Sequence, residues 1–118
     1  MTEQETRKLA EFAGFKLLDT QFHEHSFGTA EVETWQYPNG ETSCYLPDFF
    51  DISALFKWVV SKFSKFSKPQ ITFQELMNGR WRCDMKASLG LLDSTKYSFA
   101  AAETPGLSLR MAILKLIE

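Results

Sequence analysis

Two short stretches that end in Asn-Gly constrain the fold of this chain more than any other feature. They are Pro38-Asn39-Gly40 and Met77-Asn78-Gly79, and each lies between segments rich in β-branched and aromatic residues. A three-residue loop of this kind suits a type I turn whose glycine takes a left-handed conformation and closes a one-residue bulge. The sequence therefore predicts two antiparallel β-hairpins.

The length of the first loop predicts which side chains share a face of the first hairpin. Tyr37 pairs with Glu41 across the loop, and side chains alternate between the two faces of a strand. One face is then expected to carry Val32, Thr34, Cys44 and Leu46, and the other Trp35, Tyr37 and Tyr45.

The second hairpin can be drawn with a loop of two residues or of three. A two-residue loop would place Phe73 on the face opposite to Cys83, which would leave the strands without a common apolar face. A three-residue loop places four apolar side chains together, namely Ile71, Phe73, Trp81 and Cys83. We therefore expect a bulged turn here as well.

The segment DISALFKWVVSKFSKFSK, residues 51–68, has the spacing of an amphipathic helix. In a strand, Phe63 and Phe66 would point to opposite faces, whereas a helix that begins after an Asp51 N-cap puts them on one stripe. The expected core stripe is Ile52, Leu55, Phe56, Val59, Phe63 and Phe66. The opposite arc is expected to carry Lys57, Ser61, Ser64 and Lys65.

A short helix is predicted near the N-terminus. Thr2 and Glu5 have the spacing of a capping box, and Gly14 suits a left-handed helix end. Within this helix, one face carries Leu9, Phe12 and Ala13. Residues 20–28 follow neither a helical nor a strand period, and we expect them to form an irregular loop.

A last strand at residues 96–103 is followed by Thr104 and Pro105, which suit a helix cap and a first-turn proline. The helix that begins there is apolar around most of its circumference, so it is either deeply buried or covered by a partner. Its second side can be covered by the N-terminal helix with residues 20–28, or by a second copy of the chain. We expect a homodimer.

These elements predict an α+β fold with the order helix, strand, strand, helix, strand, strand, strand, helix. We expect a largely antiparallel sheet of about five strands with helices packed on it, in one compact domain over residues 1–118. The 118 residues are 44% hydrophobic and include eleven phenylalanines, which is enough to fill one core without disulfides.

No apolar run approaches the roughly 20 residues of a membrane-spanning helix. With two cysteines and no leader, a reducing cytoplasm is expected.

Charge is distributed unevenly along the chain, although the net charge is only −2. Residues 1–51 contain ten acidic and three basic residues, whereas residues 52–82 contain six basic residues and one acidic residue, Glu75. This asymmetry is a hint about binding partners of the basic middle of the chain. The alternative is that acidic and basic elements simply lie side by side in the fold.

The candidate binding residues combine cations with aromatic rings. Phosphate recognition needs converging donors, and a tryptophan or tyrosine can stack on a base. Trp58 lies outside the core stripe of its helix, so burial in the main core does not explain it. The candidates are Lys57, Trp58, Lys62, Lys65, Arg80 and Arg82, with Trp35 or Tyr37 as a further stacking surface. The alternative is a solvated lysine face.

Other chemistries find little support in the sequence. His23 and His25 are the only histidines, and no cysteine or histidine cluster lies near them in the sequence to complete a zinc site. With no histidine outside this loop, a serine nucleophile has no plausible base. No glycine-rich phosphate loop is present, and Asp48 and Asp51 suit helix capping. We therefore expect no enzyme activity, no metal and no cofactor.

From residue 51 onward, the order helix, strand, strand, strand, helix matches that of double-stranded RNA-binding domains. Those domains contact phosphates through a lysine cluster at the start of the last helix. The corresponding stretch here is PGLSLRM, with Arg110 as its only cation. Binding to duplex RNA is therefore not expected.

Four stretches carry a resemblance that covers most of the chain: LAEFAGF, LPDFFDISALFKWVVSKF, ITFQELMNGRWRCDM and YSFAAAETPGLSLRMAILKLIE. In their order and spacing they resemble the phage ABA sandwich domain family of small phage and prophage proteins. The likeness lies in core and helix-cap residues. It departs from the family at Phe12 and Phe15, where tryptophan is common, and it supplies no catalytic residue to match. It implies a virus-encoded accessory protein in the bacterial cytoplasm.

Two functions from different classes follow. The first is a non-enzymatic inhibitor or adaptor that binds a host or phage protein, such as a protein of antiviral defence. The alternative is a binder of a nucleotide or another anionic small molecule at the candidate residues above.

Overall fold

The structure is a computed structural model that describes residues 3–25, 28–63, 68–88 and 95–117; for residues 3, 21–25 and 28–31 it describes the backbone. The predicted α+β class is confirmed, with helices and antiparallel strands in the expected order plus one additional strand. The strands form two three-stranded sheets, with the orders β1-β2-β3 and β4-β5-β6, rather than one sheet of about five strands.

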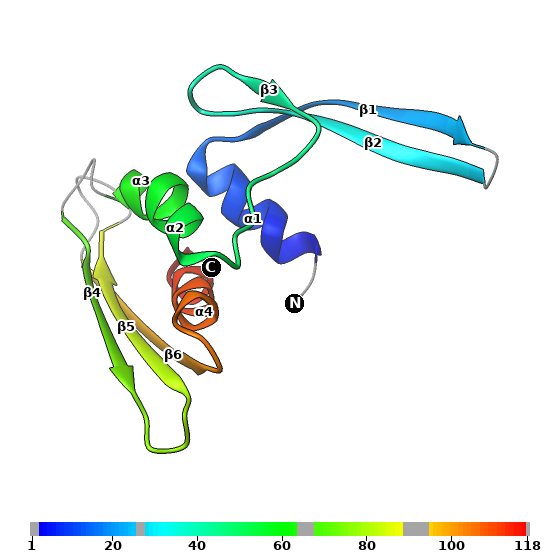
Figure 1. Cartoon of the computed structure of the whole chain (residues 1–118). Coiled ribbons are helices and arrows are strands. Elements are labelled where there is room, and N and C mark those ends of the chain that lie inside the picture. The colour runs from blue at the N-terminus through cyan, green and yellow to red at the C-terminus, as the bar shows by residue number, and fades with distance from the viewer. Residues whose placement is uncertain (1–2, 26–27, 64–67, 89–94, 118) are drawn as a thin grey trace.

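The helices pack between the two sheets (Figure 1). Helix α4 lies on the sheet β4–β6, and both α1 and the helical segment of residues 52–63 pack on α4. That segment, called here the middle helix, runs continuously through α2, η1 and α3. The helices are α1 (Glu3–Ala13), α2 (Ile52–Ala54), the π-helix η1 (Leu55–Val60), α3 (Ser61–Phe63) and α4 (Pro105–Ile117). The strands are β1 (Lys16–His25), β2 (Gly28–Gln36), β3 (Thr42–Ser43), β4 (Gln70–Glu75), β5 (Trp81–Ala87) and β6 (Lys96–Ala102).

Both bulged turns are confirmed. In the first, Tyr37 N–H donates to the Glu41 carbonyl at 2.7 Å, and Gly40 has a φ of 91°. In the second, Leu76 N–H donates to the Arg80 carbonyl at 2.7 Å, and Gly79 has a φ of 80°. A positive φ is readily adopted by glycine because it has no Cβ. Phe73 pairs with Cys83, so the predicted common apolar face of the second hairpin is also confirmed.

The prediction of an irregular loop at residues 20–28 is wrong for the described part. Strand β1 extends to His25 and pairs with β2 from Lys16↔Gln36 to His25↔Gly28. Figure 1 shows the two strands running out from the helices as a ribbon. The described side chains of β1 form no alternating apolar face, since the neighbours Leu17 and Leu18 are both exposed, and the register is interrupted by a bulge between Leu17 and Asp19. Hydrophobic periodicity therefore gave no signal here.

The first predicted hairpin is shorter than expected. Strand β3 contains only Thr42 and Ser43, and Cys44 and Leu46 lie beyond it. The prediction that these two residues share a sheet face with Val32 and Thr34 is therefore wrong. The chain leaves the sheet because the Tyr45 N–H donates to Ser43 Oγ, while the Tyr45 carbonyl accepts from the Tyr37 hydroxyl. Strand β2 pairs instead with β1 along its whole length.

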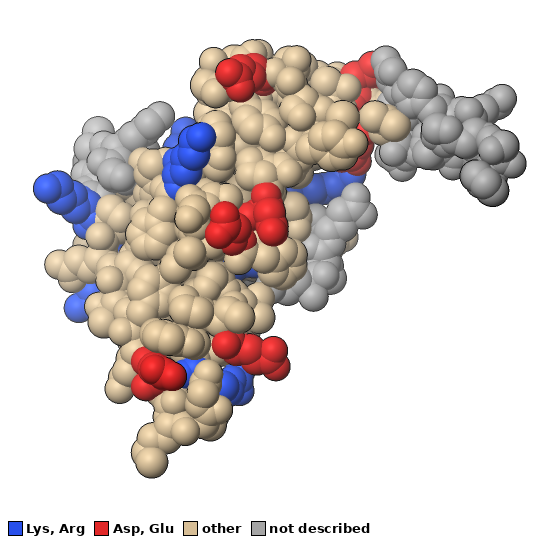
Figure 2. Space-filling view, viewed as in Figure 1, with Lys and Arg blue, Asp and Glu red and all other residues tan. Residues whose placement is uncertain are grey.

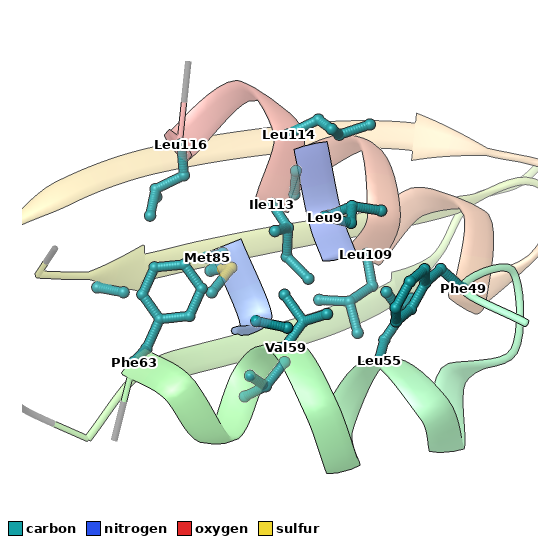
Figure 3. Close-up of a cluster of buried hydrophobic side chains, with 14 of the residues drawn as sticks. Leu9, Phe49, Leu55, Val59, Phe63, Met85, Leu109, Ile113, Leu114 and Leu116 are labelled. Atoms are coloured by element: carbon teal, nitrogen blue, oxygen red, sulfur yellow. The ribbon is translucent and has the colours of Figure 1, made fainter. Parts of the chain in front are cut away.

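The buried side chains form one cluster that draws on both helices and sheets. Figure 3 shows Leu55, Val59 and Phe63 of the middle helix pointing toward Leu109 and Ile113 of α4. Strand β5 contributes Cys83 and Met85 from the opposite side. This arrangement agrees with the predicted core positions of the described residues, with one exception in the middle helix.

The exception is Phe56, which was predicted to be in the core and is 42% exposed. Residues 55–60 form a π-helix, in which hydrogen bonds join residues five apart rather than four. Each residue therefore advances by a smaller angle, and Leu55, Val59 and Val60 all fall on the buried side. Phe66, also predicted to be in the core, lies outside the described residues, as do Ser64, Lys65 and Thr2.

The second side of α4 is covered from within the chain. Helix α1 and the middle helix pack there, so deep burial of α4 needs no second copy. The predicted start of α4 is confirmed, since Leu107 N–H donates to Thr104 Oγ1 at 3.1 Å and the helix begins at Pro105. At Gly106 the backbone comes so close that a Cβ would lie 2.5 Å from the Phe50 carbonyl oxygen.

Candidate functional site

Two adjoining surface pockets, of about 290 and 370 Å³, lie where the middle helix meets the turn between β2 and β3. They share Pro38 and Lys62, and together they are called here the lysine hollow. The first is lined by Lys57, Trp58, Ser61 and Lys62 of the middle helix and by Asn39 of the turn. The second adds Lys16, Gln36, Tyr37 and Gly40. Three lysines from two distant parts of the sequence, the start of β1 and the middle helix, therefore line one surface.

The end of α1 positions the N-terminal side of the lysine hollow. Gly14 has a φ of 98° and ends the helix, after which the chain turns into β1 and presents Lys16. A Cβ built on Gly14 would lie 3.6 Å from Pro38 and 3.9 Å from Lys62 Nζ. The helix end, the turn and Lys62 are thus in close packing.

The middle helix positions the opposite side through its π-helical part. Ser61 Oγ donates to the Lys57 carbonyl at 2.7 Å, which is the carbonyl that the Ser61 N–H would bond in an α-helix. Lys57 and Trp58 lie within the π-helix. Such insertions are frequent at functional sites.

Trp58 is explained by an aromatic cluster rather than by the main core. Its ring packs edge-to-face against Phe15, with centroids 5.3 Å apart, and against Tyr37, with centroids 5.4 Å apart. The Lys57 ammonium lies 4.9 Å from the centroid of the same ring. Trp58 therefore joins the middle helix to Phe15 and to Tyr37, the residue that follows β2, while its partly buried side chain still lines the first pocket.

Trp35 is a structural residue. Its side chain is 3% exposed, and its indole Nε1 donates to Glu33 Oε2 at 3.2 Å. Glu33 also pairs with Arg7 of α1. A ring buried in this way offers no stacking surface to a ligand. Of the candidate residues, Lys57, Trp58, Lys62 and Tyr37 meet at the lysine hollow, and Lys65 lies outside the described residues.

Arg80 and Arg82 belong to the sheet β4–β6 and do not line the lysine hollow. Arg82 forks onto Asp84, with Nε and Nη2 each 3.1 Å from a carboxylate oxygen, and Tyr97 donates to the same carboxylate. These hydrogen bonds hold the pKa of Asp84 below its usual value and raise the pKa of Arg82. Arg80 Nη2 donates to the Ala101 carbonyl at 3.0 Å. Both arginines therefore make their hydrogen bonds to residues of β5 and β6.

Lysine and arginine do not form a continuous basic surface on the face shown in Figure 2, where small blue and red groups are separated by uncharged atoms. No described helix is long and apolar enough to cross a membrane. Among the described side chains, no three histidine, cysteine or acidic residues gather as metal ligands; the side chains of His23 and His25 are outside that set.

Sequence reasoning missed Lys16, Pro38 and Asn39 as lining residues. Lys16 carries no local signal, because its place beside Lys62 depends on how α1 packs against the turn. Comparison with protein-family models, with curated proteins and with solved structures finds no match for this chain.

Proposed function

We propose that this protein is a non-enzymatic binding protein that holds an anionic group of its ligand in the lysine hollow. The observation that carries this proposal is the gathering of Lys16, Lys57 and Lys62 around two adjoining pockets. Lys57 and Lys62 come from the middle helix and Lys16 from the start of β1, and an anion bound in the pockets would be attracted by each of these charges.

The hydroxyl groups of the lysine hollow support binding rather than catalysis. Ser61 Oγ donates to the Lys57 carbonyl, and the Tyr37 hydroxyl donates to the Tyr45 carbonyl at 2.6 Å. A nucleophilic hydroxyl needs an adjacent base that accepts its proton. Here both protons go to backbone carbonyl groups.

Thermal unfolding with a panel of anions tests this proposal. Inorganic phosphate, sulfate, tripolyphosphate and adenosine monophosphate are suitable probes, since a ligand at one hundred times its dissociation constant adds about 2.7 kcal/mol of stability. We expect stabilisation that disappears in the double variant Lys57→Gln/Lys62→Gln. The matched control is Lys86→Gln/Lys96→Gln, which changes two exposed lysines of the sheet β4–β6. Equal stabilisation of both variants, or none of the parent, would contradict the proposal.

A second candidate function is the binding of a protein partner through the β1–β2 ribbon. The radius of gyration is 16.2 Å, compared with about 13.5 Å for a compact domain of this length, and Figure 1 shows the ribbon running out from the helices. Leu17 and Leu18 of β1 are exposed. An isolated two-stranded ribbon is only marginally stable in water, which favours a partner that covers it.

The partner would be a host or phage protein, and the setting the bacterial cytoplasm, if the resemblance to the phage ABA sandwich family holds. Inhibition of a defence protein is then the expected effect. A protein captured by the parent chain should be lost with Leu17→Ser/Leu18→Ser if the ribbon binds it.

The homodimer stays a prediction that light scattering can test against the 13.6 kDa mass of one chain.

A further inference from the structure

We infer that the ligand of the lysine hollow is a short acidic segment of a protein, whose carboxylates meet Lys57, Lys62 and Lys16 in turn. This inference rests on the proposed function, and it names the chemical class of the ligand. It joins the two candidate functions, because the anion is then carried by a protein partner.

The order of the lysines favours an extended ligand with several charges. Lys57 lines only the first pocket, Lys16 lines only the second, and Lys62 lines both. The cations therefore follow one another across the two pockets rather than converging on one point. A single phosphate group can contact one part of this arrangement, whereas a chain that carries repeated carboxylates can contact all of it.

The aromatic residues argue against a nucleotide. Trp58 packs its ring against Phe15 and Tyr37, and the Lys57 ammonium lies over it at 4.9 Å. The Tyr37 ring is engaged in turn by Phe15, with centroids 4.6 Å apart. Single-stranded nucleic acids are held by aromatic faces on which bases stack. Both rings are partly buried and already packed against other aromatic rings, so they offer a base less open face than a free stacking platform does.

The charge of the whole chain argues against a nucleic acid as well. The formal net charge is −2 and the isoelectric point is about 5.7, whereas nucleic-acid-binding domains are typically basic. A long phosphate backbone would be repelled by the acidic N-terminal third of the chain. A short acidic peptide needs only the local field of the three lysines, since charges are screened over about 10 Å at 0.1 M salt.

The rest of the lining suits a peptide. Ala13, Pro38 and Trp58 provide apolar surface for the methylene groups of glutamate side chains. Gln36 carries a carboxamide, which can pair with a peptide backbone. Asn39 can contribute its amide N–H groups, since its Oδ1 accepts from the Glu41 N–H at 3.0 Å. Lysine is a compact charge on a flexible stem, so it can follow carboxylates of variable spacing, whereas bidentate recognition would require arginine.

The test is a titration followed by NMR, with the indole N–H signal of Trp58 as the reporter. The buried Trp35 and the sheet residue Trp81 serve as internal controls, and the probes are hexaglutamate, hexaglutamine, tripolyphosphate and hexathymidylate. We expect hexaglutamate to move the Trp58 signal, and hexaglutamine to leave it in place. Lys57→Gln/Lys62→Gln should weaken hexaglutamate binding by roughly three- to tenfold or more, since each exposed pair contributes up to about 1 kcal/mol. Lys86→Gln/Lys96→Gln should leave it unchanged.

The outcomes separate this inference from the proposed function. If tripolyphosphate or hexathymidylate binds at the lysine hollow and hexaglutamate does not, the acidic-segment inference is overturned while the anion site stands. If no probe moves the Trp58 signal, both fail. If hexaglutamate binds equally to the parent and to Lys57→Gln/Lys62→Gln, its site lies elsewhere, and the inference is again overturned.

Discussion

Arg110 of α4 is a cation whose side chain lies inside the protein, against α1 and Phe50. In the sequence it is the only cation in the first turns of the last helix, where duplex-RNA-binding domains place phosphate contacts. In the structure it is fully buried, its Nη2 donates to Thr6 Oγ1 at 2.9 Å, and its guanidinium lies 4.3 Å from the Phe50 ring centroid. Burial lowers the pKa of Arg110, and the nearby carboxylates of Glu5 and Asp48 oppose that effect. Arg110 therefore ties α1 to α4 and is not available to a phosphate.

Cys83 leads to a prediction about stability at high pH. Burial, with a smaller effect of Asp84, raises the pKa of this thiol from 9.0 to about 11. The unfolded chain therefore loses the thiol proton at a lower pH than the folded protein does. The stabilisation is complete below pH 9 and should be lost as the pH rises toward 11, by on the order of 2–3 kcal/mol.

Urea unfolding at several pH values between 7 and 11 measures this effect. The parent should lose more stability across this range than Cys83→Ala, because the variant lacks the titrating group. Cys44→Ala is the matched control, since Cys44 is exposed and its removal should leave the pH dependence of the parent unchanged. Parallel curves for the parent and Cys83→Ala would contradict the prediction.

The middle helix contributes residues both to the core and to the candidate site. Its π-helical part buries Val59 and Val60 together on one side, and it carries Lys57 and Trp58 on the side that faces the turn. A regular α-helix would bury Phe56 in place of Val60. The core face and the candidate site thus both depend on one local change in hydrogen bonding.

Alanine substitution of two phenylalanines tests this helix geometry. Phe63 is fully buried, with its ring centroid 4.8 Å from that of Phe12, so Phe63→Ala should lower the free energy of unfolding by about 3–5 kcal/mol. Phe56 is its matched control, because the two residues have the same type but Phe56 is half exposed; Phe56→Ala should cost about 1 kcal/mol or less. Denaturant unfolding measures both values, and equal costs would indicate a regular α-helical stripe.

The helices lie between two sheets, and these sheets differ in how extensively the helices contact them. Strand β5 lies between β4 and β6 and contacts α4, whereas β1 and β2 pair chiefly with each other. The molecule is accordingly long and thin, with extents of 49 × 38 × 21 Å. Stability should therefore be unequal across the molecule, because regions with few tertiary contacts open locally.

Hydrogen exchange should reveal this difference. Amides of β5 are expected to exchange only with global unfolding, and those of the β1–β2 ribbon beyond the Thr20↔Glu33 pair at least about a hundredfold faster, which corresponds to about 3 kcal/mol. Amides at the base of the ribbon, near Trp35, are the internal control and should be intermediate because Trp35 is buried. Equal protection in the ribbon and in β5 would show that the free protein stabilises the ribbon by itself.

Local features of this protein could be predicted from the sequence. The two bulged turns, the helix end at Gly14 and the cap at Thr104 were correct, because each depends on backbone preferences and hydrogen bonds within a few residues. Most of the core positions were also correct, since one buried face imposes a period on a helix or a strand. Four of the candidate binding residues were chosen for their charge or aromatic ring and line the lysine hollow in the structure, namely Lys57, Trp58, Lys62 and Tyr37.

Features that depend on contacts between distant segments were decided only by the tertiary structure. Strand β1 pairs with β2 from Lys16 to His25, and its described leucines Leu17 and Leu18 are exposed, so no apolar period marks it in the sequence. The π-helix buries Val60 in place of Phe56 through its fit against α4, and propensity does not predict that fit. Lys16 lines the same pocket as Lys62 because the end of α1 packs on the turn. Arg80 and Arg82 instead hydrogen-bond to residues of the sheet β4–β6. The physical reason is that sequence neighbours set local backbone conformation, while packing sets which side chains share a surface.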